Sequence, residues 1–414
     1  MTRIPPLGFG AATAAALAVA IAAASLPGSP VRVGEVERGD GTTIVFVAAL
    51  ASAFVLYAAG LLLLRHHSSC VLAVCAIATA IQLIPLAGPL LLSHDVYSYW
   101  AYARIAAQHN EDPYVVPPAS FPADPATRAV APGWRGTTSV YGPGFTVSSV
   151  VADEAAGGSA ERVALIFRIT AALAAIGATV LAAGIARAKS FAAAFVGWNP
   201  LLAVSFAGGG HNDALMLVLM LGALALALRK RDVGAGALWV LAGAVKAPAL
   251  LLVPLQLACG RRRLWLGVGL TAVAGSIAAS ALFGSAWLTG LGRIGRHEAR
   301  YAIPVRLEQF GVPDALAHLL ALMVLVLGAL WLLRQARNGR PRLALGACLL
   351  VLTTPWLLPW YATGRSRWPP SKRTLRPRSS RSPLPPTFCR RVFPSRREPS
   401  PTPLRRSSRR RRGG

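Results

Sequence analysis

The chain has 414 residues, of which 54% are hydrophobic and only 14% are charged. This composition excludes an ordinary soluble globular domain, in which about a quarter of the residues are charged. The net charge of +27 is concentrated at one end, because residues 361–414 hold 17 lysines and arginines against one acid and supply +16 of it (17 − 1).

Apolar segments long enough to cross a bilayer recur along the chain. They cover about residues 7–27, 42–64, 70–92, 161–186, 190–207, 212–228, 233–258, 264–283, 313–333 and 342–361. The sequence therefore predicts an all-α fold, a polytopic transmembrane helical bundle of about ten spans within residues 1–361. Alanine and glycine are frequent in these segments, which favours close helix–helix packing. Lys246 and Pro248 interrupt 233–258, so this segment is predicted to be a broken pair of short helices.

Basic residues cluster in the short loops near positions 65, 187, 229, 261 and 334. The positive-inside rule places these loops in the cytoplasm and the loops 93–160 and 284–312 outside. The basic cluster at Arg261 fits this arrangement only if 233–258 turns back.

The first outer loop begins with an Asp-Val-Tyr-Ser-Tyr element at Asp95, which we interpret as an amphipathic helix lying at the outer membrane surface. Asp95, flanked by His94, is a candidate general base. The alternative is a helix cap, since Asp and Ser cap helices well. Asp112–Pro113–Tyr114 and Tyr141–Gly142–Pro143 are typical of turns.

Three glycines precede His211, Asn212 and Asp213 between two apolar segments. Glycines allow a ligand to approach the backbone closely, so this stretch is a candidate binding turn, although Asn212 or Asp213 alone is equally compatible with a helix cap. Lys246, inside an apolar segment, predicts a site for an anion or an ion pair, with snorkelling to the interface as the alternative. Loop 284–312 includes Arg296 and Arg300, which suit phosphate.

The amino-acid composition changes abruptly after Tyr361, and residues 362–414 are rich in Arg, Pro and Ser. This composition predicts disorder. A basic tail for anionic lipid or nucleic acid is one interpretation. We favour a shift of reading frame near residue 363, because a G+C-rich gene that is translated out of frame tends to give a sequence rich in Arg, Pro and Ser.

The ordered set of motifs resembles a known family. Its members are the actinobacterial polyprenol-phosphomannose-dependent α-1,6-mannosyltransferases, integral-membrane enzymes of the GT-C fold. The resemblance rests on the elements at Asp95, Tyr114, Tyr141, Trp198–Asn199–Pro200, 209–213, 245–248 and 359–361. Two departures are visible. The family continues with further spans after the last element, and it usually has Asn-Pro-Tyr where this chain has Asp112–Pro113–Tyr114.

The resemblance implies an inverting transfer of mannose from polyprenyl-phosphate mannose to a mannan or lipoglycan acceptor of the cell envelope, at the outer face of the plasma membrane. It assigns the base to Asp95. The residues expected to contact substrate are His94, Tyr97, Tyr99, Asp112, Tyr114, Tyr141, His211, Asn212, Asp213, Lys246, Arg296 and Arg300. The arginines and Lys246 are chosen for their charge, which suits a departing phosphate.

Two other functions compete with this one. A transporter or flippase also fits broken helices and a buried lysine, but it would concentrate polar groups at mid-membrane. A non-catalytic scaffold would leave Asp95 and 211–213 unexplained. No cofactor motif and no metal ligand set is expected, although metal dependence stays open, as do the acceptor and the oligomeric state. The expected partners are the lipid-linked sugar, the glycan acceptor and the bilayer, with no nucleic acid.

Overall fold

The structure is a computed structural model that describes residues 6–27, 29, 31, 33, 41–66, 69–293 and 302–353, with the backbone alone for 291–293. Arg296, Arg300 and the tail 362–414 lie outside these residues. The described chain is all-helical, as predicted. The first part contains α1 Pro6–Ser25, α2 Gly41–Leu64, α3 Val71–Leu83, η1 Ile84–Ala87, α4 Asp95–Ala107, η2 Pro118–Ser120, α5 Pro125–Ala129, η3 Pro132–Trp134, α6 Pro143–Ala156, α7 Ala160–Ile185, α8 Lys189–Gly197, α9 Pro200–Ala203 and η4 Val204–Gly208. The second part contains α10 Asp213–Leu228, α11 Asp232–Val245, η5 Ala247–Leu252, α12 Val253–Leu257, α13 Arg262–Phe283, α14 Ala286–Arg293, α15 Ile303–Gln309, α16 Asp314–Arg337 and α17 Leu343–Thr353.

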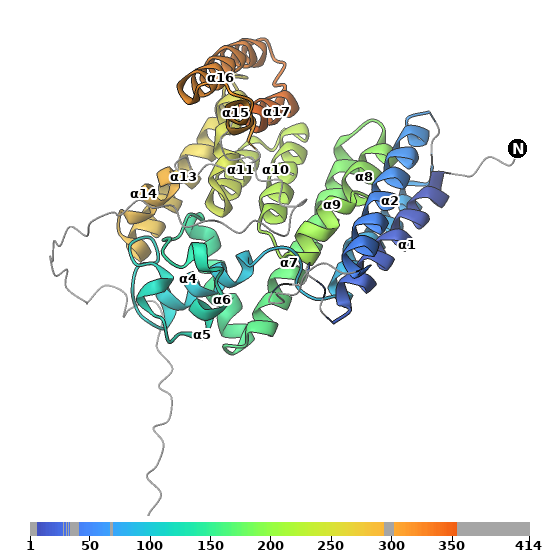
Figure 1. Ribbon diagram of the computed structural model, residues 1–414. Helices are drawn as coiled ribbons and strands as arrows, with labels where there is room; N and C mark the ends of the chain where they lie inside the picture. Colours follow the sequence, from blue (N-terminus) through green and yellow to red (C-terminus); the bar gives the residue numbers. More distant parts are fainter. Residues whose placement is uncertain are drawn as a thin grey trace, which may run out of the picture.

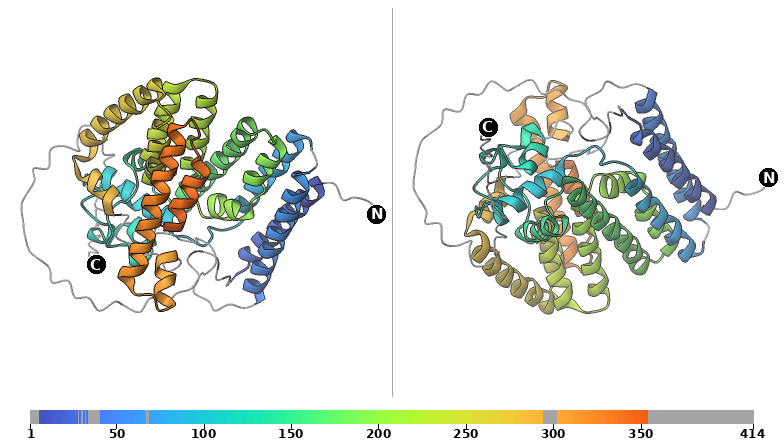
Figure 2. Two further views of the ribbon diagram at one scale, coloured as in Figure 1. Left: turned by 90° about the horizontal axis from the view of Figure 1, so that it is seen from above. Right: turned by 90° about the horizontal axis from the view of Figure 1, so that it is seen from below.

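The long helices pack side by side in a row that is not the order of the sequence. α2 packs on α1, α1 on α3, α3 on α8, and α8 on α7. The row continues with α10 on α7, α11 on α10 and α13 on α11. The helices α4, α5 and α6 lie together against α7 and α11 (Figure 1). Figure 2 shows α16 crossing the face of the second half beside α17.

Among the residues that the structure describes, five helices are long and apolar enough to cross a membrane, and a sixth span results if α8 is joined to the segment Pro200–Gly208 across a 44° bend. The five are α1, α2, α7, α13 and α16. The other predicted spans fall on shorter apolar helices, so helix length supports a multi-pass membrane protein but not the count of about ten. Asn199 and Pro200 account for the bend, because Asn199 caps α9 through the backbone N–H of Leu201 and Pro200 occupies its first turn.

Small residues allow the first helices to approach closely, as the composition suggested. A Cβ atom added to Gly10 on α1 would lie 2.6 Å from the Trp198 ring. Trp198 itself is fully buried, and its indole N–H donates to the carbonyl of Val74 at 3.0 Å. A larger residue at this crossing would separate α1 from the tryptophan, so glycine is required here for packing.

The segment from residue 232 to residue 261 forms a hairpin. α11 ends at Val245, Lys246 is extended, and the chain returns through η5 and α12. Arg261 then forms an ion pair with Asp232 and donates to the carbonyl of Ala227 at 2.9 Å. Both ends of the segment therefore lie together, which agrees with the predicted turn back at Lys246 and Pro248.

α4 is deeply buried within the protein: ten of its thirteen residues are buried, including Tyr99 and Trp100. The helix packs against α6, α5 and α7. Its aromatic residues supply a core for the loop region between α3 and α7, and its position at the outer membrane surface stays a prediction.

Candidate active site

The site is built around the first turn of α4. Asp95 is the first residue of this helix, and its backbone N–H donates to the Ser93 hydroxyl at 3.1 Å. Its side chain caps nothing: Oδ2 lies 3.3 Å from Nδ1 of His211, which is buried. The Asp95 side chain keeps 18% of its surface exposed, so a second molecule can reach it. The N-cap residue of α4 is His94, which makes no capping hydrogen bond with its side chain.

The glycine turn places His211 opposite Asp95. Gly210 has a φ of +70°, and a Cβ atom there would lie 2.4 Å from Val96 on α4. Only glycine combines this left-handed backbone with so close an approach. The turn therefore packs directly on α4, one residue after Asp95.

Arg168, a buried residue of α7, holds the turn from the other side. Its guanidinium donates to the carbonyl oxygens of Ala207 at 2.8 Å and Gly88 at 2.9 Å, and also to that of Pro85. A planar group with five donors suits three carbonyls that converge from two loops. Sequence reasoning missed this residue, although an arginine inside an apolar segment is itself a signal of function.

Asp213 and Lys246 form the second charged pair of the site. Lys246 Nζ lies 2.6 Å from Asp213 Oδ2, with 20% and 27% of the two side chains exposed. The lysine therefore does not snorkel: it reaches from the end of α11 to the start of α10. Of the two predictions for Lys246, an anion site or an ion pair, the structure contains the ion pair.

Tyr141 and Tyr99 fill the space between the two pairs. Their rings meet edge to face at 4.8 Å. Burial raises the pKa of the Tyr99 hydroxyl well above its usual value, and the nearby carboxylates of Asp95 and Asp213 add to this effect. Both tyrosines are thus neutral hydrogen-bonding groups beside two carboxylates.

Backbone contacts connect the Tyr141 turn to the end of α11. The Gly142 N–H donates to the Val245 carbonyl at 3.2 Å, and a Cβ on Gly142 would overlap the Ala244 carbonyl. Four motifs that are separate in the sequence, at Asp95, Tyr141, 209–213 and Lys246, thus meet in one place.

Asn212 is the least satisfied polar residue of the site. It is 2% exposed, and neither polar atom of its carboxamide has a hydrogen-bond partner among the described residues. It precedes α10 but makes no capping bond with its side chain. Buried polar groups are normally paired, so an unpaired amide beside two carboxylates points to a ligand.

The remaining predicted residues have other surroundings. Tyr114 is buried, and its hydroxyl donates to the Tyr141 carbonyl at 2.9 Å, so it supports the Tyr141 turn. Asp112 accepts the Tyr114 N–H at 2.8 Å, as a turn residue does. Burial raises the pKa of Asp112 to about 6. His94 precedes Asp95 and contacts the Tyr97 ring, and burial lowers the His94 pKa.

A second group that sequence reasoning missed fixes α4 in place. Arg104 donates to both carboxylate oxygens of Asp124, at 2.9 and 3.0 Å, and His109 contacts the same carboxylate at 2.8 Å. The Trp100 indole N–H donates to Asp153 on α6. These buried and partly buried polar contacts hold α4 by its sides, and its first turn, with Asp95, lies at the site.

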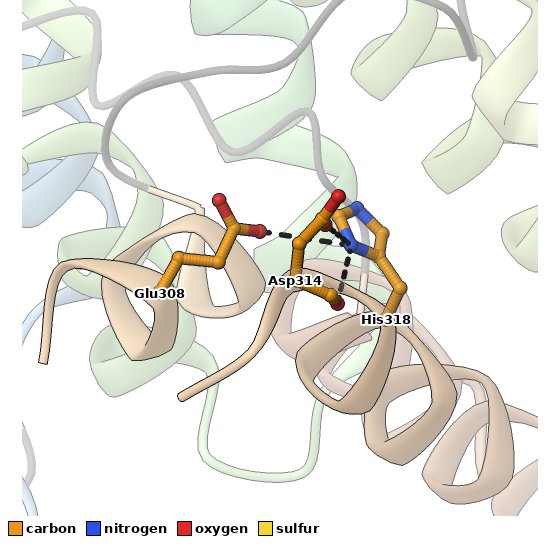
Figure 3. A group of neighbouring side chains, drawn as sticks. All are labelled: Glu308, Asp314 and His318. Atoms are coloured by element: carbon orange, nitrogen blue, oxygen red, sulfur yellow. Dashed lines mark hydrogen bonds and ion pairs between the residues drawn. The ribbon is translucent and has the colours of Figure 1, made fainter. Parts of the chain in front are cut away.

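One group of side chains offers ligand atoms for a metal ion, although no metal ligand set was predicted. Glu308, Asp314 and His318 have ligand atoms within 4.8 Å of one another (Figure 3). They belong to α15 and α16, which carry none of the residues around Asp95. His318 Nδ1 lies 2.6 Å from Asp314 one turn earlier, which is a common helix pair, and 3.6 Å from Glu308 Oε1 on α15.

Comparison with known proteins agrees with the resemblance seen in the sequence. A family model described as "Alpha-(1->6)-mannopyranosyltransferase, N-terminal domain" matches residues 6–260. This range contains every residue of the site built above. No solved structure matches the chain.

Curated relatives match over shorter stretches. The chain is 34% identical over 187 residues to Alpha-(1->6)-mannopyranosyltransferase A of Corynebacterium glutamicum, covering 42% of this chain and 36% of the relative. It is 31% identical over 175 residues to the protein of the same name from Mycobacterium tuberculosis, covering 40% of this chain and 34% of the relative. Alpha-(1->6)-mannopyranosyltransferase B of C. glutamicum is 34% identical over 165 residues, covering 38% and 27%. The chain thus spans about a third of the length of the curated relatives it matches.

Proposed function

Because the chain belongs to the alpha-(1->6)-mannopyranosyltransferase family, we propose that it is a membrane glycosyltransferase that forms α-1,6 linkages. Its donor is polyprenyl-phosphate mannose and its acceptor a mannan or lipoglycan of the cell envelope. Transfer takes place at the outer face of the plasma membrane. The observation that carries the proposal is the pairing of Asp95 with His211 next to the Asp213–Lys246 pair.

Asp95 is the general base in this proposal. It accepts the proton of the acceptor hydroxyl as the hydroxyl oxygen forms a bond to the anomeric carbon from the side opposite the phosphate. The bond between that carbon and the phosphate oxygen breaks, and its electron pair leaves with the lipid phosphate. Asp213 is less suited to the role, since its carboxylate is compensated by an ammonium group at 2.6 Å. His211 orients the Asp95 carboxylate.

The departing phosphate needs positive charge. Lys246 supplies a cation at the site, but it shares that charge with Asp213. Arg296 and Arg300, which lie outside the described residues, remain our candidates for the larger part of this role. Asn212 offers a donor and an acceptor together, which suits a sugar hydroxyl group. Tyr97, Tyr99 and Tyr141 complete the walls of the proposed substrate site.

The position of the polar groups favours an enzyme over a transporter. Asp95 and Asp213 begin α4 and α10, and Lys246 follows the end of α11. All three thus lie at helix ends. Broken helices of a transporter also bring helix ends to a binding site, but they do so near the bilayer midplane. Asp95 instead belongs to α4, which lies in the segment between α3 and α7 and is not among the helices long enough to cross a membrane.

The test is sugar transfer in membranes from cells that express the full chain, with radiolabelled polyprenyl-phosphate mannose and a short α-mannoside. We expect transfer by the original chain and a rate about 10²–10⁴-fold lower for Asp95→Asn. Glu154→Gln, which changes an exposed acid on α6, is the matched control and should retain activity. Transfer by Asp95→Asn at the original rate would remove Asp95 as the base. Uptake of the labelled lipid without transfer would favour transport.

A further inference from the structure

A cavity of about 570 Å³ opens among the ends of α7, α10 and α12 and the start of α17. α10 connects the two regions, because it begins at Asp213 in the site and ends at Leu228 on the cavity wall, roughly 24 Å away for a helix of this length. The main lining side chains are Ile185, Leu224, Leu228, Gln256, Arg261 and Arg342. None of them belongs to the candidate active site.

The cavity is apolar with a few converging polar groups. Gln256 is 5% exposed, and it is a polar side chain on the cavity wall. Arg342 is exposed, and its guanidinium lies 5.9 Å from the centre of the Trp331 ring. The first turn of α17, which begins at Leu343, also lines the cavity. Backbone N–H groups in a first helical turn have no partner within the helix and attract anions.

Strong positive charge surrounds this cavity. The chain segments next to the lining residues Ile185, Leu228, Arg261 and Arg342 carry Arg187, Lys189, Arg229, Lys230, Arg231, Arg262, Arg263, Arg334, Arg337 and Arg340. Asp232 is the one acid of these segments, and it is compensated by Arg261. By the positive-inside rule this end of the bundle faces the cytoplasm. The anionic lipids of a membrane are enriched in that leaflet, and basic pockets between spans bind their head groups.

We propose that this cavity binds the phosphate head group of an anionic phospholipid of the cytoplasmic leaflet. Arg342, the Gln256 amide and the N–H groups at the start of α17 contact the phosphate. The acyl chains follow the apolar wall at Leu224 and Leu228. Arg261 is already bound to Asp232 and Ala227 and shapes the cavity.

Charge argues against the chain's own tail as the occupant. Residues 361–414 contain 17 basic residues and one acid, so a basic cavity repels them. A phosphate diester supplies the opposite charge together with the hydrocarbon that the leucines require. This site is independent of the proposed sugar transfer, because it needs neither Asp95 nor a lipid-linked sugar.

The test uses the full chain purified in an uncharged detergent. Native mass spectrometry measures its binding of phosphatidylglycerol and of phosphatidylcholine with the same acyl chains. We expect the anionic lipid to bind more tightly, and Arg342→Gln to weaken this binding about five-fold, the effect of one basic group near a lipid surface. Arg340→Gln is the matched control, because Arg340 is exposed and two residues away but does not line the cavity.

Two results would overturn the proposal. One is equal binding of the two lipids by the original chain. The other is equal weakening by Arg340→Gln and Arg342→Gln, which would mean diffuse surface attraction. Gln256→Glu is a second variant that places a negative charge inside the cavity, and it should weaken binding of the anionic lipid more than that of phosphatidylcholine. The melting temperature of each variant without added lipid shows whether it has folded.

Discussion

Lys246 Nζ lies 2.6 Å from the Asp213 carboxylate, so two residues 33 positions apart connect the end of α11 to the start of α10. Each contributes a charge that the other needs, since both side chains are mostly buried. The pair fixes the hairpin of α11 to the helix that follows His211 and Asn212. A change at either position should therefore affect stability and activity in separable ways.

Removing one charge of this pair should destabilise the protein, and removing both should largely restore it. Lys246→Met leaves Asp213 uncompensated, at an expected cost of about 1–3 kcal/mol, between the values for exposed and fully buried pairs. Lys246→Met with Asp213→Asn should recover most of that stability but not sugar transfer. Thermal unfolding in detergent and a transfer assay measure the two effects. A double variant as unstable as the single one would contradict this account.

Asp95→Asn should reduce the rate of transfer by about 10²–10⁴-fold, the usual contribution of a general base. Asn retains the size and a hydrogen-bond acceptor for His211, so the melting temperature should change little. His211→Gln should reduce the rate less, because it orients the base without accepting the proton. Initial rates at saturating donor measure both variants. A larger loss in His211→Gln than in Asp95→Asn would reverse the assigned roles.

Gly210→Ala should abolish the turn that carries His211. The left-handed φ of +70° disfavours alanine, and its Cβ would lie 2.4 Å from Val96. We expect a loss of about 1–3 kcal/mol together with most of the activity. Gly184→Ala on α7 is the matched control: no atom lies within 4 Å of its added Cβ, so stability should stay the same or rise.

The ionisation of Asp112 should lower the free energy of unfolding as the pH rises from about 4 to about 6. Burial raises its pKa from 3.8 to about 6, so in this range the folded state binds a proton that the unfolded state has lost. At pH 7 the ionised group therefore costs about 1–2 kcal/mol after allowance for solvent screening. Asp112→Asn keeps an oxygen for the Tyr114 N–H and should remove this part of the pH dependence. Unfolding curves at pH 4.5 and 7 test the difference.

The sequence predicted much of the local structure but few of the contacts between residues that are far apart in the chain. The break at Lys246 and the polar turn at 209–213 are local patterns, and each appears where the residues indicated. The apolar segments form helices where they are described, but only five or six of these are long enough to cross a membrane. The burial of α4 was not predictable, because an aromatic helix suits both a membrane surface and a protein core. The three carbonyls bound by Arg168 were likewise out of reach, since its partners lie up to 83 positions away.

The hairpin 232–261 has a consequence for how the chain is threaded. Its first residue, Asp232, and its last, Arg261, form an ion pair with each other, so both ends lie on the same side of the membrane. The hairpin therefore contributes an even number of membrane crossings. The side on which α13 begins is then the same whether or not the hairpin is present. We expect a topology reporter fused after Arg231 and one fused after Arg263 to lie on the same side of the membrane. Deletion of the hairpin should leave the orientation of the later helices in the membrane unchanged. This region is thus an insertion in the bundle that leaves downstream topology unchanged.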